Sequence, residues 1–556
     1  MRRRQKQQSS RSWVLILVGL TLLLLVGCAS CWLIYQTAQR DVSGENKVTL
    51  QIACSPEKRA LFDELVKRYN AGRPKTSSGK RITVVVTQME PEAMIQAALD
   101  GQFQAISPDS SVWLSQMELD WQAKQDSGIS IVGETTRFAL SPVVIATWED
   151  TARSLGYPDK AIGWADILAL ARSNPDFKWS HPSTSSASGL LATLATFYAG
   201  AGKTRGLTVE DATAEATIKY VTTLEKTVRY YGEGERAIIE QVQAKGRSYL
   251  DAFVIQEQLV IEFNQHNKDK LVAVYPAEGT LWEDHPLVFL ERPDSTADQR
   301  LAYRSFRGFL LSHDAQMLVL SNGYRPSDLN IALDSAPSPI GAANGVDPAQ
   351  PKTTLQIPSP AVVQVVRDVW QYTKRKTNAY LIADVSGSMQ GVKLEQAKEA
   401  FLTFLGMIKG EQERVGLIVF STDVQEAAPV AELSTNRSTL NSMIEGLNAG
   451  GDTSLLDAIN LAYDRLQERQ DKERINAIVV MTDGKENNSR VRLRDLTAKL
   501  GKGSQSGVPV VVFCVAYGND AEMSTLEAIA TATGGQARRG SPETIRELYK
   551  LLSTYF

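Results

Sequence analysis

The sequence predicts an α/β protein in which a two-lobed unit precedes a doubly wound parallel sheet, and three observations support this prediction. The chain of 556 residues is too long for one hydrophobic core. Apolar runs of strand length alternate with amphipathic runs of helical period along most of it. A stretch rich in proline, residues 336–360, has little periodic hydrophobicity and divides the chain in two, so we predict a linker there.

The first 35 residues predict an uncleaved membrane-spanning helix. Residues 1–12 are basic and contain no acidic residue, and residues 13–35 form an uncharged apolar run. At a rise of about 1.5 Å per residue this run covers roughly 34 Å, enough to cross the hydrocarbon core of a bilayer. Because basic residues favour the cytoplasmic side, we expect the rest of the chain outside the cell membrane.

A lipoprotein signal is the alternative interpretation of the same run. Leu25–Cys28 resembles a bacterial lipobox, in which Cys28 would carry the lipid and become the new N-terminus. The apolar run continues past Cys28 to Tyr35, whereas a mature lipoprotein normally begins with a polar tether. We therefore favour the spanning helix, and both interpretations place the bulk of the protein on the outer face of a membrane.

In the region 47–335, hydroxyl side chains recur where helices are predicted to begin. The stretch "SHPSTSSASG" precedes an apolar helix, and "SPDSSVWL" follows the same pattern. Backbone N–H groups and hydroxyls at a helix start suit a small anion or a polar solute. Ordinary helix capping is the alternative explanation.

The order of these predicted elements resembles bacterial extracellular solute-binding proteins of the type II periplasmic-binding fold. The phrases "SPDSSVWL", "IQEQLVIEFN" and "LVAVYPAEGTLWEDHPLVFL" carry the resemblance. It implies one lobe at about 47–140 and 275–335, a second lobe at about 141–274, and a ligand cleft between them. The candidate cleft residues are Ser55, Ser110, Ser111, Ser183, Thr184, Ser185 and Glu257. A cleft that binds no solute stays open as an alternative.

Near-continuous apolar strands alternate with amphipathic helices in the region 376–556. The strands include "AYLIADV", "RVGLIVFS", "NAIVVMTD" and "VPVVVFCVAYG". This alternation predicts a parallel sheet covered by helices on both faces. Ligands of such sheets bind at the carboxyl ends of the strands.

Short oxygen-bearing side chains gather at these predicted strand ends. Asp384, Ser386 and Ser388 alternate in "DVSGS", Thr453 follows two glycines at a predicted helix start, and Asp483 ends another apolar strand. Two carboxylates and three hydroxyls form a hard oxygen site that suits Mg²⁺ or Mn²⁺. Each of these residues taken alone could instead cap a helix or form a turn.

The region 376–556 resembles a von Willebrand factor A domain. The pattern D-x-S-x-S with a later Thr and Asp is that family's metal-ion-dependent adhesion site. The resemblance implies that the ion is held by Asp384, Ser386, Ser388, Thr453 and Asp483. It also implies an open coordination position that accepts an acidic residue of a protein partner. Asp452, beside the threonine, is a third acid that we do not assign as a ligand.

From these inferences we predict a bacterial binding protein that is anchored in the membrane and faces outward. We do not expect it to be an enzyme. The first region would bind a small polar solute or a peptide, and the second a protein through Mg²⁺. The runner-up is the solute receptor of an ABC transporter, lipid-anchored at Cys28. An envelope hydrolase is a third hypothesis, with His181 as a base beside Ser180 and Ser183.

Composition and motifs exclude other classes. A net charge of −3 provides no long-range attraction to nucleic acid. The four cysteines and four histidines lack the spacing of a zinc site. G-x-S-x-G, H-E-x-x-H and P-loop motifs are also missing from the sequence.

Overall fold

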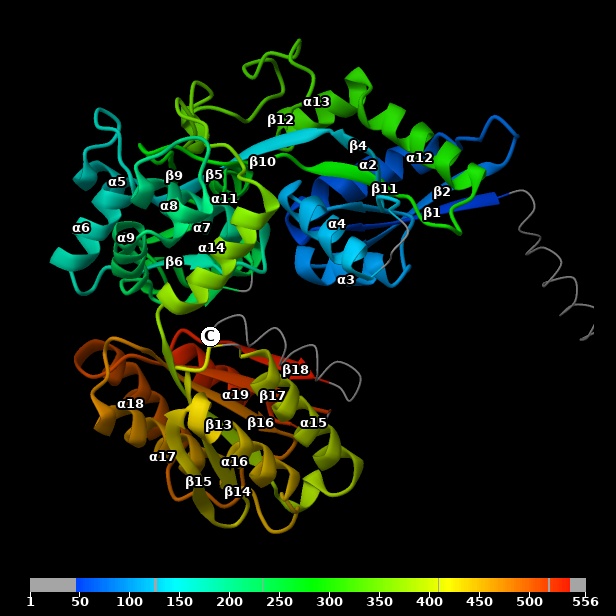
Figure 1. Ribbon diagram of the computed structural model, residues 1–556. Coiled ribbons are helices and arrows are strands. Elements are labelled where there is room, and N and C mark those ends of the chain that lie inside the picture. The colour runs from blue at the N-terminus through cyan, green and yellow to red at the C-terminus, as the bar shows by residue number, and fades with distance from the viewer. Residues whose placement is uncertain (1–46, 125–127, 233, 409, 519–520, 541–556) are drawn as a thin grey trace, which may run out of the picture.

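The computed structural model describes residues 47–124, 128–232, 234–408, 410–518 and 521–540 (Figure 1). The predicted membrane span 13–35, which includes Cys28, lies outside these residues. Among the helices that the structure describes, none is both long enough and apolar enough to cross a membrane. Cys54 and Cys514 are buried free thiols.

The first lobe contains a five-stranded sheet in the order β2-β1-β3-β11-β4. β1 pairs in parallel with β2 and β3, whereas β11 runs antiparallel to β3 and β4. The strands are β1 (Lys47–Cys54), β2 (Arg81–Gln88), β3 (Ala105–Ser107), β4 (Val132–Arg137) and β11 (Pro286–Leu290). The helices are η2 (Pro56–Lys58), α2 (Arg59–Ala71), α3 (Pro91–Leu99), α4 (Val112–Lys124), α12 (Ala297–Leu310) and α13 (His313–Ser321). Phe62 packs against Phe138 and Phe306 in its core, with ring centroids 5.9 and 6.0 Å apart.

The second lobe contains a sheet in the order β10-β5-β8-β6-β7, with β9 and β12 also paired to β5. The strands are β5 (Ala139–Trp148), β6 (Trp179–Pro182), β7 (Tyr231–Gly232), β8 (Ala252–Gln256), β9 (Leu271–Val274), β10 (Trp282–Glu283) and β12 (Arg325–Pro326). The helices are α5 (Glu149–Leu155), α6 (Trp164–Ser173), α7 (Ala187–Ala201), α8 (Val209–Thr213), α9 (Glu215–Glu225), α10 (Glu235–Lys245), η3 (Gly246–Ser248), α11 (Glu257–His266) and η4 (Ala342–Asn344). α7 is buried over most of its length because its sequence is apolar on every face.

Three short crossings join the lobes, and the last runs from the end of α13, Ser321, to the start of β12, Arg325. The chain leaves the first sheet at the end of β4, Arg137, and enters the second sheet at the start of β5, Ala139. It returns through Asp284 and His285, which lie between β10 and β11. Residues near these crossings therefore lie close to both lobes.

The proline-rich segment 336–360 lies against the second lobe. The Tyr198 hydroxyl donates to the Gln356 carbonyl at 2.6 Å, and the Ala273 N–H donates to the Gly345 carbonyl at 2.8 Å. The segment leads into α14 (Pro360–Thr373), whose apolar face is buried. α14 packs on α7, α8 and α9. The first domain, as we use the term below, therefore covers residues 47–373.

The second domain contains a six-stranded sheet in the order β15-β14-β13-β16-β17-β18, parallel except for β15. The strands are β13 (Thr377–Asp384), β14 (Arg414–Phe420), β15 (Val424–Glu432), β16 (Ile475–Thr482), β17 (Val510–Tyr517) and β18 (Ala537–Gly540). The helices are η5 (Gly387–Met389), α15 (Val392–Met407), α16 (Leu433–Glu445), α17 (Leu455–Arg469), α18 (Leu493–Ser506) and α19 (Met523–Ala532).

Alternate residues of β13 enter two different cores, which is the arrangement predicted for a doubly wound sheet. Leu381 belongs to one core with Phe401 of α15, and Ile382 belongs to another with Ile459 of α17. Both cores are dry and fully buried at these positions. The mixed α/β fold of both domains is thus confirmed.

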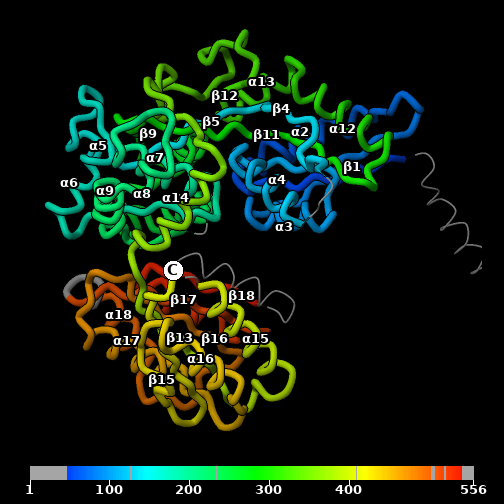
Figure 2. Tube along the Cα trace, viewed as in Figure 1, coloured from blue at the N-terminus to red at the C-terminus, as the bar shows by residue number. Residues whose placement is uncertain are grey.

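The two domains meet where α14 ends. Figures 1 and 2 show the two-lobed first domain above the second domain, with α14 on the side of the second lobe that faces the second domain. Only Lys374–Lys376 separate the end of α14 from the start of β13. The strands of the second domain begin at this junction, so their carboxyl ends point away from the first domain.

Candidate functional site

Two carboxylates lie at the carboxyl edge of the sheet of the second domain. β13 and β16 are adjacent and parallel, with Ala383 opposite Met481 in the register. Asp384 ends β13, and Asp483 directly follows β16. Because parallel neighbours end at the same edge, the two acids lie side by side there.

Asp384 is held in place by hydrogen bonds and is 1% exposed. Its Oδ1 accepts from the Ser386 N–H at 2.8 Å, and its Oδ2 accepts from the Thr482 hydroxyl. Burial raises the pKa of Asp384, and the charge of nearby Asp483 adds to this effect. A positive charge at this edge would favour the ionised form.

The two serines face each other and the second acid. Ser386 Oγ and Ser388 Oγ are 3.0 Å apart, and the Ser388 hydroxyl donates to Asp483 Oδ1 at 2.7 Å. The other oxygen of Asp483 pairs with the Lys393 ammonium. Lys393 extends from the first turn of α15. It was not among the predicted site residues, because a lysine in a helix is usually a solvent-exposed charge.

Thr453 reaches the same edge from the loop before α17. The Gly387 N–H donates to the Gly451 carbonyl at 2.9 Å, and the Gly450 N–H donates to the Val385 carbonyl at 2.7 Å. These bonds dock the threonine loop on the serine loop. A Cβ atom at Gly484 would lie 3.0 Å from Thr453 Oγ1 and 3.3 Å from Ser388 Oγ, so both hydroxyls face the space beside Gly484.

A cavity of about 290 Å³ opens at this edge. It is lined by Ser386, Ser388, Gly451, Thr453, Asp483, Gly484, Lys485 and Asn487. Four of the five predicted metal ligands thus line one cavity, and the fifth, Asp384, lies directly behind Ser386. Asp452 is exposed and does not line it.

The donor set fits a hard divalent ion. Carboxylate and hydroxyl oxygens are the groups that Mg²⁺ and Mn²⁺ prefer. A glycine at position 484 leaves the space between the hydroxyls open. Lys485 and Asn487 line the cavity from one side and were not predicted from the sequence.

The candidate cleft residues of the first domain form separate groups. Ser55 and Ser110 are fully buried in the first lobe, after β1 and β3, and the Ser111 N–H donates to Asp284 Oδ1 at 2.7 Å. The Ser110 hydroxyl accepts from the Val112 N–H at 3.3 Å, which is a local cap. The first-lobe serines are thus near the crossing at 284–285.

The second-lobe candidates have structural partners. Ser183, Thr184 and Ser185 form the turn between β6 and α7, and the Ser185 N–H lies 3.4 Å from Ser183 Oγ. The Glu257 carboxylate pairs with Arg325 through bonds of 2.9 and 2.7 Å and accepts from the Tyr275 hydroxyl. Glu257 is therefore neutralised by a neighbour that ties α11 to β12.

His181 also has structural partners. Its Nδ1 lies 2.8 Å from the Pro182 carbonyl oxygen, and its Nε2 lies 3.3 Å from Glu225 Oε2. The Ser180 hydroxyl bonds instead to the Tyr230 carbonyl at 2.5 Å. This arrangement shows no base held against a serine hydroxyl.

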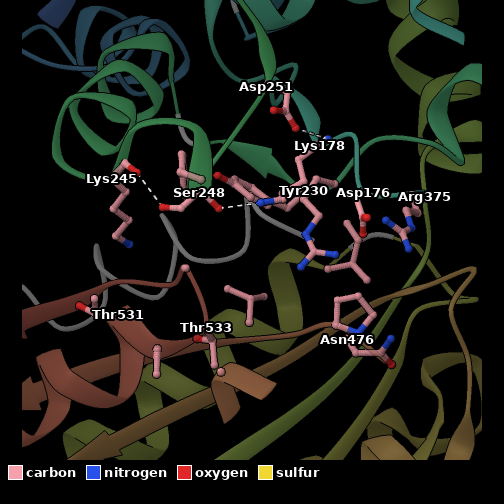
Figure 3. A pocket seen from close by; sticks show the side chains of 18 of the residues that line it. Asp176, Lys178, Tyr230, Lys245, Ser248, Asp251, Arg375, Asn476, Thr531 and Thr533 are labelled. Carbon is pink, nitrogen blue, oxygen red and sulfur yellow. Dashed lines mark hydrogen bonds between the residues drawn. The ribbon is translucent and has the colours of Figure 1, made fainter. Parts of the chain in front are cut away.

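A third feature is a cavity of about 690 Å³ between the two domains (Figure 3). Lys245, Ser248 and Tyr230 approach it from the first domain, and Asn476, Thr531 and Thr533 from the second (Figure 3). The lining residues also include the basic side chains Lys178, Arg229, Arg375 and Arg474. Burial and nearby Arg229 lower the pKa of Arg375 to about 10.

Arg375 ties the two domains together. Its guanidinium donates to the Val228 carbonyl of the first domain at 2.7 Å. It also donates to the carbonyls of Lys472, Glu473 and Arg474 in the second domain, at 2.6, 3.1 and 3.3 Å. One side chain thus binds backbone atoms on both sides of the junction.

Comparisons with known proteins agree with both domains. Residues 378–547 match the von Willebrand factor type A domain, and residues 50–325 match the bacterial extracellular solute-binding protein family. Inter-alpha-trypsin inhibitor heavy chain H4 of Sus scrofa is 29% identical over 182 residues, which are 31% of this chain and 19% of that protein. The chain thus spans about a fifth of the length of the curated relatives it matches.

Two solved structures are similar to parts of the chain. A von Willebrand factor type A protein from Catenulispora acidiphila is 20% identical and covers 32% of this chain and 42% of that one, with a TM-score of 0.29. The sulfate-binding protein SubI from Mycobacterium tuberculosis H37Rv is 18% identical and covers 52% of this chain and 90% of that one, with a TM-score of 0.37.

Proposed function

Because the chain joins a bacterial extracellular solute-binding domain to a von Willebrand factor type A domain, we propose that it is an extracytoplasmic binding protein with two binding sites. The first domain binds a small solute between its lobes. The second domain binds a protein partner through Mg²⁺ or Mn²⁺ at its carboxyl edge. The apolar run 13–35 anchors the protein in the cell membrane with the bulk outside.

One observation supports the second site most strongly: four predicted ligands from three loops line the same cavity. Ser386, Ser388 and Thr453 would offer hydroxyl oxygens, and Asp384 and Asp483 would supply negative charge. Two carboxylates balance a dication, so the bound ion would offer a coordination position to an acidic side chain of the partner. No reaction is part of this proposal.

The position of the edge supports a role in contact with a partner. The strands of the second domain begin at the junction with the first domain, so their carboxyl ends lie at the opposite end of the sheet. The first domain therefore does not cover the cavity. A protein that presents a carboxylate can approach it from solvent.

Calorimetric titration with Mg²⁺ and Mn²⁺ tests this site. We expect Asp384→Ala to abolish binding of both ions at the carboxyl edge, because it removes one of the two carboxylates. Asp452→Ala removes a neighbouring exposed acid and is the matched control, for which we expect the affinity of the wild type. Equal affinity in Asp384→Ala and wild type, with both proteins folded by circular dichroism, would refute the proposed site.

A further inference from the structure

Five titratable side chains that the proposed function does not yet use lie buried between the two lobes. We call them the interlobe cluster: Glu57, Asp109, Glu235, Glu283 and His285. Each is at most 3% exposed. Glu283 and His285 are two positions apart, and the other three come from distant parts of the chain. Asp109 lies in "SPDSSVWL", and Glu283 and His285 lie in "LVAVYPAEGTLWEDHPLVFL", but none of the five was predicted as a ligand.

The cluster draws on both lobes and on a crossing between them. Glu57 and Asp109 follow β1 and β3 in the first lobe. Glu235 is the first residue of α10 in the second lobe, and Glu283 and His285 lie on the crossing from β10 to β11. This is the position of a ligand that two lobes enclose.

The spacing of the ligand atoms matches that of a metal site. One ligand atom each from Asp109, Glu283 and His285 lie within 4.8 Å of one another. The same holds for Glu57, Asp109 and Glu235, so Asp109 belongs to both groups. Oxygen atoms at this separation can share one ion.

Positive charge in the cluster falls short of its negative charge. Lys58 Nζ lies 2.9 Å from Asp109 Oδ1 and 3.4 Å from His285 Nδ1. Arg236 donates to the Glu57 carbonyl, but its guanidinium charge is matched by Glu262, at 2.5 and 3.0 Å. One ammonium therefore faces four carboxyl groups in a region without solvent, which is unfavourable unless a cation or protons compensate.

Polar atoms of the cluster also lack partners. Within the described residues, both carboxylate oxygens of Glu57 and of Glu283 are buried without a hydrogen bond, as is His285 Nε2. Ser55 Oγ lies beside Glu57, and Gln256 Oε1 lies beside Glu235. Both atoms are also buried without a hydrogen-bond partner. Buried polar groups are normally satisfied, so a set of this size in one place indicates a ligand.

His285 has one ring nitrogen close to Asp109 and the other without a hydrogen-bond partner. His285 Nδ1 lies 3.2 Å from Asp109 Oδ1, and a proton on Nδ1 leaves the lone pair on Nε2. A carboxylate behind a histidine is the usual support of a metal-bound imidazole. Tyr324 packs edge-on against the ring at 5.0 Å and restricts its rotation.

We propose that the solute enclosed by the first domain is a divalent transition-metal cation, held by the interlobe cluster. The proposal rests on the proposed function of this domain as a solute-binding unit and specifies its ligand. Carboxylates together with an imidazole suit Mn²⁺, Fe²⁺ or Zn²⁺. The same carboxylates repel small anions, which were one of the two ligand classes, beside polar solutes, expected from the serine-rich helix starts.

The test measures bound metal in the full chain after removal of metal with a chelator. Asp384→Ala serves as the background, because it removes the proposed ion at the carboxyl edge of the second domain. We expect this background protein to take up one equivalent of Mn²⁺ or Zn²⁺ by equilibrium dialysis with elemental analysis. Added metal should also raise its unfolding temperature.

Two substitutions locate the ion. Glu283→Gln and Glu235→Gln keep the side-chain shape but remove a charge. We expect each to weaken binding by at least about 100-fold, since even supporting residues around a metal contribute about 10–100-fold. Glu240→Gln changes an exposed glutamate on the same helix as Glu235 and should leave the affinity unchanged.

Each possible result of the dialysis experiment either supports or contradicts metal binding by the interlobe cluster. Uptake that Glu283→Gln and Glu235→Gln remove, in proteins that circular dichroism shows to be folded, supports it. Uptake that these changes leave intact overturns it. If the background protein binds neither Mn²⁺ nor Zn²⁺ but binds a diamine such as putrescine, the proposal of a metal ligand is wrong and the proposal of solute binding is supported. The same conclusion holds if native mass spectrometry detects another bound solute. If neither metal nor any solute binds, solute binding by the first domain fails as well.

Discussion

Gly484 is a backbone position that lies directly against the candidate metal site. It directly follows Asp483, and the space where a side chain would begin lies between the hydroxyls of Thr453 and Ser388. A methyl group there would be tighter against Thr453 Oγ1 than ordinary van der Waals contact allows. The hydroxyls would have to separate by a few tenths of an ångström.

We expect Gly484→Ala to weaken Mg²⁺ binding at the carboxyl edge about tenfold, or about 1.4 kcal/mol. The fold should persist because the clash involves side-chain atoms that can move. Gly450→Ala is the control, since a Cβ at Gly450 would meet nothing within 4 Å. Calorimetry that finds equal weakening in both variants would show that loop stiffness, and not the space beside Thr453, is responsible.

Residues marked by a short motif or by the end of an apolar strand could be predicted as a site, and residues without such a signal could not. Asp384, Ser386 and Ser388 occupy one short segment, and their spacing already indicates convergence at a strand end. Lys393 carries no such signal, although its ammonium pairs with Asp483. Glu235 likewise reads as an ordinary acid in the first turn of a helix, and only the closure of two lobes brings it to Asp109.

At the scale of elements, α14 belongs to the first domain although it leads directly into the second. Its apolar face packs on α7, α8 and α9. The Trp370 ring lies 5.1 Å from that of Tyr231 and 6.3 Å from that of His181, both in the second lobe. We therefore expect α14 to stabilise the first domain.

We expect Trp370→Ala to destabilise the first domain by about 3–5 kcal/mol, the usual cost of removing a buried aromatic side chain. Tyr372→Ala, on the same helix but 75% exposed, should change stability by less than about 0.5 kcal/mol. Differential scanning calorimetry of the full chain checks both. A loss confined to the unfolding transition of the second domain would contradict this assignment of α14.

Elements with a clear period were predictable, and irregular ones were not. The continuous apolar run of β13 and the amphipathic run of α15 both appear as predicted. The segment 336–360 was predicted from composition alone as a linker. Its backbone carbonyls accept hydrogen bonds from Tyr198 and Ala273. Contacts made by backbone atoms cannot be predicted from the side chains of the segment.

For the whole molecule, the junction and the candidate metal site lie at opposite ends of one sheet. β13 begins two residues after Arg375 and ends at Asp384. At about 3.3 Å per residue, its eight residues separate the two places by roughly 26 Å. The strand between them is buried over all eight of its residues.

Arg375→Met should loosen the junction and leave metal binding unchanged. The variant loses the charge-assisted bonds to four carbonyls, and we expect a cost of roughly 2 kcal/mol for docking of the two domains. Small-angle scattering should show a larger radius of gyration, with no such change for Lys376→Met. An unaltered scattering profile in Arg375→Met would mean that other contacts fix the domains.

The position of β13 also determines how the molecule carries mechanical load. A partner that is held at the carboxyl edge and drawn away exerts tension along β13, toward Lys374–Lys376. β13 is flanked by β14 and β16 in parallel register over seven residue pairs on each side, so their hydrogen bonds are strained together in shear. The segment Lys374–Lys376 has no such flanking strands. Stretching is therefore expected to begin at Lys374–Lys376, so that a partner bound at the carboxyl edge would stay bound while the two domains separate.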